Sequence, residues 1–183
     1  MIANLLLSDK ILIRKNKDKS LFIQKSFGEK NKTDFVLDLI EAYYLLEKGK
    51  IEIEDKKGKK IESDELLLIG QKKINDFYKK YLVYCDFRER GYVVKTGFKF
   101  GFDLRVYPKG KKPGEEHTQW VVAVKGQNDR INFIELSRKV RLSGNIKTKL
   151  LFAVVDSEND INYYETVRVT PWKKGKKWMK KIH

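Results

Sequence analysis

The sequence predicts two mixed α/β domains, a small one at residues 1–82 and a second one at residues 83–172. A chain of 183 residues is long enough for two small domains with a real core. Short apolar runs and segments of helical periodicity fill the first region, whereas long alternating or apolar strands prevail in the second. Residues 173–183 are basic and aromatic, and we expect them to form a tail suited to an anionic ligand.

The first half of the small domain is expected to contain two short strands and a helix. The apolar triplets at 11–13 and 21–23 are typical of short strands. Thr33 or Asp34 can cap the helix, because their side-chain oxygens accept hydrogen bonds from free backbone amides, and Gly49 is placed to end it.

A hairpin and a long helix complete this domain. Isoleucine alternates with glutamate at 51–54, and a lysine-rich turn leads from there to a second strand at Ile61. The long helix is expected to begin at Ser63, because the acids that follow it favour a helix N-terminus, and to continue towards Arg90. We expect a break in this helix near Gly70.

Several strands and one helix are expected in the second domain. They are one or two strands within 92–107, a strand at 117–124, a helix that Asn132 caps and Gly144 interrupts, and strands at 150–155 and 161–169. The near-continuous apolar run at 150–155 is typical of a strand covered on both faces. This order of elements predicts an α/β domain of about 100 residues.

The segment from Gly91 to His117 carries the most chemical information. Alternation puts an apolar set on one strand face: Phe98, Phe100, Phe102, Leu104 and Val106. The other face receives a polar set: Lys99, Asp103, Arg105 and Tyr107. Tyr107 is thereby predicted to lie on a basic face, just before a Pro/Gly/Lys loop that leads to His117. A tyrosine and a histidine at the two ends of one basic loop indicate proton transfer on an anion.

The charge balance favours a polyanionic partner. Lysine and arginine number 40 against 25 acidic residues, which gives a formal net charge of +15. The resulting field attracts nucleic acid or an anionic membrane surface, although a lysine-rich, heat-adapted surface is an alternative explanation. The sequence shows no apolar run of about 18 residues and no signal-peptide pattern, so we expect a soluble, cytoplasmic protein without a membrane partner.

Cysteine and histidine are too scarce for the common cofactor sites. Cys85 is the one cysteine, so no internal disulfide can form, and one cysteine with two histidines cannot build a common zinc site. The sequence also has no glycine-rich phosphate loop. We therefore expect phosphate chemistry without a metal, a nucleotide or another cofactor.

Four stretches of the second domain carry a family pattern: YLVYCDFRERGYVVKTGFKFGFDLRVYPKG, EEH, RKVRL and LLFAVVDSENDINYYE. Together they resemble the archaeal tRNA-splicing endonuclease, closely over about residues 80–170 and more loosely over the N-terminal third. The resemblance implies a restriction-endonuclease-like C-terminal α/β domain with a central mixed sheet, and a small N-terminal α/β domain. It also implies excision of introns from precursor tRNA at a bulge–helix–bulge, which is recognised by shape because A-form RNA hides its base edges.

The resemblance further implies a metal-independent reaction, with Tyr107 as the general base and His117 as the general acid. The products are a 2′,3′-cyclic phosphate and a 5′-hydroxyl, so the base takes the 2′-hydroxyl proton and the acid protonates the leaving 5′-oxygen. Histidine suits the acid, because its reference pKa is about 6.5. A free phenol titrates only at about 10, and the charges of Lys99 and Arg105 would favour the phenolate that a base requires.

The lysine of this family is missing from the matched position. It lies seven residues after the arginine that Arg141 matches, and this chain has Thr148 there. Lys149 or Lys147 can supply the positive charge after a shift of one residue, and Lys149 is the preferred candidate. Alternatively, the chain has been altered at this position to lower its activity. A third explanation is a noncatalytic partner subunit, although such subunits usually lose the tyrosine and the histidine too.

Two further features match the family. Asp156, Glu158 and Asp160 form an acidic turn, and a similar loop in the family inserts into a basic pocket of a neighbouring subunit. A solvated hairpin turn is the alternative explanation. Arg141 and Arg168 match the arginine pair that sandwiches a flipped-out base of the bulge.

We therefore expect an endonuclease that acts on precursor tRNA as an oligomer. Two cleavage sites on one substrate require two active sites at a fixed separation, which a symmetric assembly supplies. A tetramer is favoured, either of identical chains or with a related subunit. The rival hypotheses are a noncatalytic RNA-binding subunit of the same enzyme and a generic basic binding module.

Overall fold

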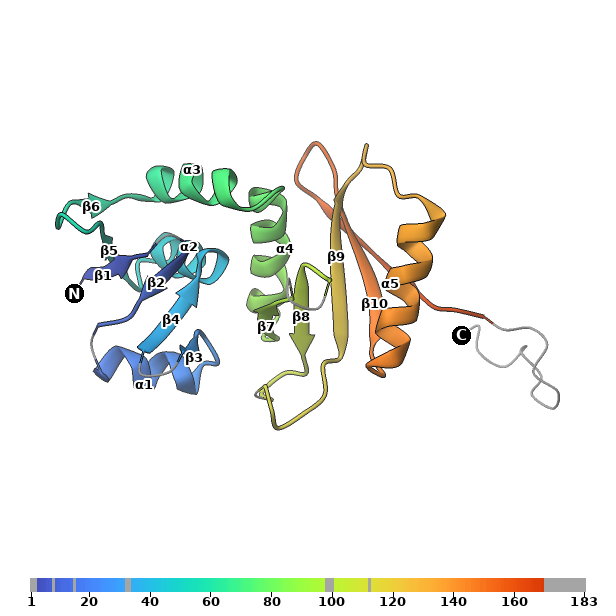
Figure 1. Cartoon of the computed structure of the whole chain (residues 1–183), viewed down its shortest axis with the longest axis horizontal. Coiled ribbons are helices and arrows are strands. Elements are labelled where there is room, and N and C mark those ends of the chain that lie inside the picture. Colours follow the sequence, from blue (N-terminus) through green and yellow to red (C-terminus); the bar gives the residue numbers. More distant parts are fainter. Residues whose placement is uncertain are drawn as a thin grey trace.

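Two domains lie side by side in the computed structural model, each built around its own sheet, with helix α4 (Phe77–Glu89) between them (Figure 1). The structure describes residues 3–7, 9–14, 16–31, 34–97, 101–111 and 113–169. The expected mixed α/β class is confirmed. Within these ranges, every helix is too short or too polar to cross a membrane.

The N-terminal domain combines a six-stranded sheet with three helices. Its elements are β1 (Ala3–Leu6), β2 (Lys10–Leu12), α1 (Asn16–Gln24), β3 (Glu29–Asn31), β4 (Asp34–Asp38), α2 (Leu39–Glu47), β5 (Glu52–Glu54), β6 (Lys60–Ile61) and α3 (Ser63–Lys73). The strand order is β3-β4-β2-β1-β5-β6, in which only β1 and β5 are parallel neighbours. Leu39 and Ile40 of α2 are buried in the same core as Ile11 and Ile53 of the sheet.

One expected strand of this domain is wrong. Residues 21–23 belong to α1, and of the three only Phe22 is buried, while Leu21 and Ile23 face solvent. An apolar run of three residues does not distinguish a strand from a helix, because the two periodicities diverge only over longer stretches.

The first long helix begins later than expected. Asp34 opens the strand β4, and Thr33 lies outside the described residues. The cap is Asp38, whose Oδ1 accepts a hydrogen bond from the backbone amide of Glu41 at 2.9 Å. Gly49 follows the helix with φ of 62°, which agrees with its expected place at the helix end.

The long helix expected after Ser63 is two helices. Helix α3 continues through Gly70, and the break falls at residues 74–76, where Asp76 has φ of 54°. Gly70 serves packing instead, because a Cβ at this residue would lie 2.5 Å from the ring of Phe77. The domain division expected after residue 82 falls inside the continuous helix α4, so we place the division at the 74–76 break.

The C-terminal domain has a five-stranded mixed sheet. Its strands and second helix are β7 (Val93–Thr96), β8 (Leu104–Tyr107), β9 (Trp120–Gly126), α5 (Phe133–Asn145), β10 (Lys149–Val155) and β11 (Ile161–Thr166). The strand order is β11-β10-β9-β8-β7, and β9 and β10 are the one parallel pair, which α5 connects. Gly144 does not interrupt α5, which ends one residue later.

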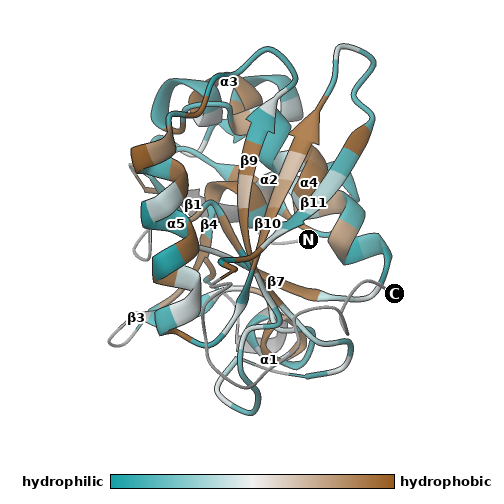
Figure 2. Cartoon of the chain, turned by 90° about the vertical axis from the view of Figure 1, so that its right-hand side faces the viewer, coloured by the Kyte–Doolittle hydropathy of each residue, from teal (hydrophilic) through white to brown (hydrophobic). Residues whose placement is uncertain are grey.

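Helices α4 and α5 cover opposite faces of this sheet (Figure 1). Leu104, Val106 and Val122 share a core with α4, whereas Val121 and Leu150 pack with residues of α5. Figure 2 shows hydrophobic residues concentrated on β10, as expected for a strand covered on both faces, and alternating hydrophobic and hydrophilic residues along α5.

The alternation predicted along 98–107 is interrupted. Residues 98–100 lie outside the described residues, and the strand itself begins at Leu104. Phe102 packs with α5, on the face opposite to Leu104, and Asp103 points towards α4, where its carboxylate meets the Lys80 amine at 2.9 Å. Asp103 and Leu104 therefore point to the same side of the sheet, as in a β-bulge. Phe102 and Asp103 thus lie on the faces opposite to those predicted.

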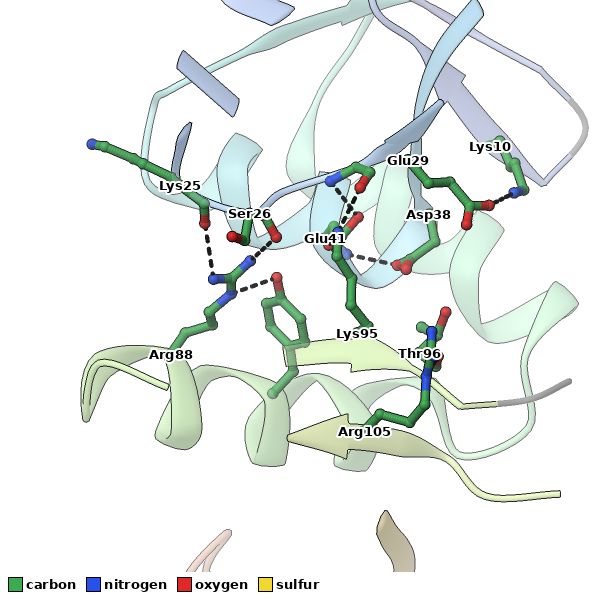
Figure 3. A network of polar contacts seen from close by, with 12 residues as sticks. Lys10, Lys25, Ser26, Glu29, Asp38, Glu41, Arg88, Lys95, Thr96 and Arg105 are labelled. Carbon is green, nitrogen blue, oxygen red and sulfur yellow. Dashed lines mark hydrogen bonds and ion pairs between the residues drawn. The ribbon is translucent and has the colours of Figure 1, made fainter. Parts of the chain in front are cut away.

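A buried ion pair joins the two domains (Figure 3). The Lys95 amine, on β7, donates to the Glu41 carboxylate of α2 at 2.8 Å and to the Gly28 carbonyl oxygen at 2.6 Å. The other oxygen of Glu41 accepts the backbone N–H of Gly28 at 3.0 Å. The Glu41 side chain is 2% exposed and that of Lys95 is 13% exposed. Because water hardly reaches these two charges, each depends on the other and on the turn at Gly28 for its hydrogen bonds.

A second cation of the C-terminal domain contacts the same turn. Arg88 of α4 donates to the carbonyl oxygens of Lys25 and Ser26 at 3.2 and 3.0 Å (Figure 3). Its guanidinium also lies 3.9 Å from the centre of the Phe27 ring. The turn at residues 25–28 is thus fixed from the side of the C-terminal domain.

Asp38 lies beside the ion pair of Lys95 and Glu41, and its pKa is raised. It lines a cavity of about 350 Å³ together with Lys95 and Arg105. Burial, and secondarily the charge of Glu41, raise the pKa of Asp38 from 3.8 to about 7. The native state therefore holds this proton more tightly than the unfolded chain, so the stabilisation is complete below pH 3.8 and is lost as the pH rises to about 7.

We predict that Asp38→Asn flattens the pH dependence of stability, because asparagine caps the helix as well as aspartate does but carries no charge. Between about pH 5 and about pH 8, the free energy of unfolding should fall by about 2–3 kcal/mol more in the native chain than in the variant. Urea titrations at several pH values measure the free energy of unfolding of both proteins. Asp55→Asn, an exposed turn residue whose pKa is lowered, is the control and should shift stability equally at each pH. Parallel curves for the native chain and Asp38→Asn would contradict the prediction.

Candidate active site

The predicted catalytic positions lie at one end of the C-terminal sheet. Strand β8 ends at Tyr107, β9 begins three residues after His117, and β10 begins at Lys149. Because β8 is antiparallel to β9 and β9 is parallel to β10, the end of β8 meets the starts of the other two strands. This is the lower end of the sheet in Figure 1.

Two hydrogen bonds join the three strands at this end. The backbone amide of Gln119 donates to the carbonyl oxygen of Val106 at 2.8 Å, next to Tyr107. The Thr148 hydroxyl donates to the carbonyl oxygen of Thr118 at 2.7 Å, next to His117. The residues beside the candidate base and the candidate acid are therefore held in one hydrogen-bonded strip.

Tyr107 is buried, although the alternation predicted an open, basic face. Its exposed fraction is 5%, and it lies opposite Val93 of β7. Arg105 shares its face, as expected, since the two residues are two positions apart on one strand. Lys99 lies outside the described residues.

His117 is exposed and belongs to the connection between β8 and β9. Its neighbour Glu116 lies 3.6 Å from the Lys111 amine. The connection also carries Lys109, whose amine lies 5.1 Å from the centre of the Tyr92 ring. The basic loop that the sequence indicated is thus present at the sheet end, and His117 lies on it in contact with solvent.

The candidate lysine Lys149 points away from Tyr107. Alternation along β10 puts Lys149 on the face of Leu151 and Ala153, which belong to the core under α4. Its amine is 3.0 Å from the Glu165 carboxylate. Thr148 instead falls on the face of Leu150, which packs with α5.

Arg105 and Tyr107 lie on that same α5 face, because Arg105 is paired with Val121 and Val121 packs with α5. Thr148 and Tyr107 therefore share a face of the sheet, and Lys149 does not. Lys147 is exposed and has φ of 54°, a left-handed conformation that is uncommon for lysine.

The two arginines of the predicted base sandwich lie towards the same end. Arg141 is exposed on the last turns of α5, which runs to the start of β10. Arg168 follows β11, and the pairing of Thr166 with Leu150 brings it to the same edge. Both side chains face solvent.

The acidic turn lies at the opposite end of the sheet, between β10 and β11 (Figure 1). Asp156 is engaged within the turn, because its Oδ1 accepts the backbone amides of Glu158 and Asp160, each at 2.9 Å. Glu158 and Asp160 themselves are exposed.

Sequence reasoning did not identify Thr118 and Gln119, which link the site residues. They act through backbone atoms, so no side-chain pattern signals them. In the described part of the chain, no group of three or more histidine, cysteine, aspartate or glutamate residues is arranged to hold a metal ion.

A two-domain α/β fold, with a helix-bearing N-terminal domain and a C-terminal mixed sheet, agrees with the class of RNA-cleaving enzyme that the sequence indicated. Residues 2–67 match the family model of the tRNA intron endonuclease N-terminal domain, and residues 77–163 match that of the catalytic C-terminal domain. The chain is 41% identical over 145 residues to the tRNA-splicing endonuclease of Thermococcus onnurineus, which covers 79% of this chain and 82% of the relative. It is 40% identical over 138 residues to that of Methanothermobacter thermautotrophicus, with 75% and 79% covered. The chain belongs to the tRNA-splicing endonuclease family.

Proposed function

We propose that this enzyme excises introns from precursor tRNA in the cytoplasm, cutting at bulge–helix–bulge sites without a metal ion. The observation that supports the proposal is the strand pairing that puts the end of β8, at Tyr107, beside the start of β9, which follows His117, inside a domain that matches the catalytic domain of the family. The named relatives support the substrate, because they are tRNA-splicing endonucleases.

The chemistry needs one base and one acid on either side of the scissile phosphate. Tyr107 removes the proton of the 2′-hydroxyl, whose oxygen attacks phosphorus and forms the cyclic phosphate. The bond from phosphorus to the 5′-oxygen breaks, and His117 protonates that oxygen, which leaves as a hydroxyl. Because Tyr107 is buried at the strand end, the RNA must bring its 2′-hydroxyl to the sheet edge.

The charge of the chain and two exposed arginines support RNA as the substrate. A net charge of +15 attracts the phosphate backbone. Arg141 and Arg168 stand near the catalytic end with exposed side chains, so a bulged base can stack between them. Such contacts read the shape of the RNA more than its sequence.

The enzyme is proposed to work as a tetramer, either of identical chains or with a related subunit. A cavity of about 600 Å³ between the domains is lined by four basic residues, Lys25, Lys48, Lys50 and Arg88. Glu158 and Asp160 protrude from the acidic turn, and their charge complements this cavity. We propose that the acidic turn of one subunit enters the basic cavity of another.

A second candidate function is a noncatalytic RNA-binding subunit of the same enzyme. The position of Thr148 favours it, since this residue shares the face of Tyr107 where the resemblance places a lysine. The presence of both Tyr107 and His117 favours the active enzyme.

We predict that the chain cleaves a bulge–helix–bulge RNA in excess EDTA and leaves 2′,3′-cyclic phosphate ends. Tyr107→Phe and His117→Ala should each lower the single-turnover rate by about 100-fold to 10,000-fold, because each removes one proton-transfer group. Denaturing gels and mass spectrometry of the products measure both effects. Strict dependence on magnesium would refute the metal-independent mechanism.

We predict that neutralising the acidic turn lowers the mass of the assembly. The variant combines Asp156→Asn, Glu158→Gln and Asp160→Asn. The change Asp156→Asn removes the charge but keeps a side-chain oxygen that accepts the hydrogen bonds of the turn. Light scattering at low micromolar concentration measures the mass. Glu54→Gln, Glu62→Gln and Glu65→Gln together make the same change in charge elsewhere and should leave the mass unchanged. An unaltered mass in the turn variant would leave the turn as a solvated hairpin.

We predict that Lys149→Ala changes the single-turnover rate by less than about threefold, because its amine is paired with Glu165 on the face away from Tyr107. Lys147→Ala is the parallel variant, and Thr148→Lys tests a missing charge directly. If a cation at the transition state is missing, Thr148→Lys should raise the rate by about 100-fold to 1,000-fold. A loss of about 100-fold in Lys149→Ala would restore Lys149 as the catalytic cation.

A further inference from the structure

We propose that Thr148 is a positioning residue, whose hydroxyl fixes the loop that carries His117. The catalytic part of this inference rests on the proposed function. It assigns to this position a task that differs from the positive charge expected of a lysine.

The backbone of Thr148 is committed to the end of helix α5. Its amide donates to the carbonyl oxygen of Ser143 at 3.0 Å, and the amide of Lys147 donates to that of Gly144 at 3.1 Å. With Lys147 at φ of 54°, these two bonds form a Schellman cap. The amide of Thr148 therefore cannot also join the ladder between β9 and β10.

The side chain of Thr148 makes the link that the amide cannot make. Its hydroxyl donates to the carbonyl oxygen of Thr118 at 2.7 Å, across the parallel pair and one position before the ladder begins. Thr118 directly follows His117, so the bond fixes the start of β9 at the point where the loop with the histidine ends.

The bond continues to the strand of the candidate base. Gln119, the next residue, donates its amide to Val106, which precedes Tyr107. The hydroxyl of Thr148 thereby closes a strip across β10, β9 and β8, and the neighbours of the acid and of the base lie in it. Without this hydroxyl, the segment that follows His117 loses its hydrogen bond to β10. The bond from the Gln119 amide to Val106 is then the one bond of the strip that still holds this segment.

Threonine suits this task better than lysine. Its hydroxyl sits one bond from Cβ, and its branched Cβ restricts χ1, so little side-chain freedom is lost when the bond forms. A lysine amine at the end of four methylene groups must give up much more rotational freedom for one bond. Serine retains the donor, and valine retains the shape without it.

The experiment compares Thr148→Val, Thr148→Ser and the native chain in single-turnover cleavage of a bulge–helix–bulge RNA. We expect Thr148→Val to lower the maximal rate about tenfold, the worth of one hydrogen bond, with little change in the RNA concentration at half-saturation. Thr148→Ser should restore the rate to within about twofold. Thr166→Val, on the neighbouring strand β11, is the matched control and should leave the rate unchanged. If Thr148→Val does not fold, Thr148→Ala replaces it.

A double-mutant cycle separates positioning of the acid from a general loss of structure. In the background of His117→Ala, Thr148→Val should cause no further loss, because the group it positions is absent. A further tenfold loss in that background would overturn the inference, as would full activity of Thr148→Val.

Hydrogen exchange tests the tie without catalysis. The amide of Gln119 should exchange faster in Thr148→Val than in the native chain, and at the native rate in Thr148→Ser. Unchanged exchange in Thr148→Val would overturn the inference. This measurement decides it even if the native chain cleaves no RNA, an outcome that would refute only the proposed function.

Discussion

The buried ammonium of Lys95 is the contact on which the arrangement of the two domains depends. It lies on β7, the edge strand of the catalytic sheet, and reaches the carboxylate of Glu41 and the turn at Gly28. A buried pair of this kind adds little net stability, but removing one partner costs about 3–5 kcal/mol, because the other charge is left buried. Its contribution is therefore a fixed orientation, and β7 pairs directly with β8, the strand that ends at Tyr107.

The two ends of the catalytic sheet carry different features. At one end, one backbone hydrogen bond and one hydrogen bond from the Thr148 hydroxyl link the neighbours of Tyr107 and His117. The acidic turn lies at the other end, beyond the last residues of β10. In the tetramer that we propose, each chain offers this turn to a neighbour while its own site stays open to RNA. The parallel pair of β9 and β10 makes this separation possible, because it puts both strand starts beside the end of β8.

The residues at the sheet end were predictable from sequence in kind, but not in orientation. The sequence placed Tyr107 and His117 at the two ends of one basic loop, and the strand pairing brings the end of β8 beside the start of β9. Burial of Tyr107 and the interruption at Asp103 were not predictable, because period-two alternation assumes a regular strand. The face of Lys149 depends on where β10 begins, which the cap of α5 decides. In the small domain, the apolar triplet around Phe22 was too short to distinguish a helical from a strand periodicity. The helix cap could not be assigned either, because Asp34 and Asp38 are equally good capping residues in the sequence, and the structure uses Asp38.

The parallel pair also determines when the site forms. Strands β7, β8 and β9 follow one another directly along the chain, so their antiparallel contacts are more local in sequence than the pairing of β9 with β10 and can form early. The contact between Thr148 and Thr118 spans 30 residues and needs the whole crossover through α5. During synthesis, the loop with His117 therefore emerges before the strand that fixes it. A nascent chain thus completes the hydrogen-bonded strip at this sheet end only after β10 has left the ribosome.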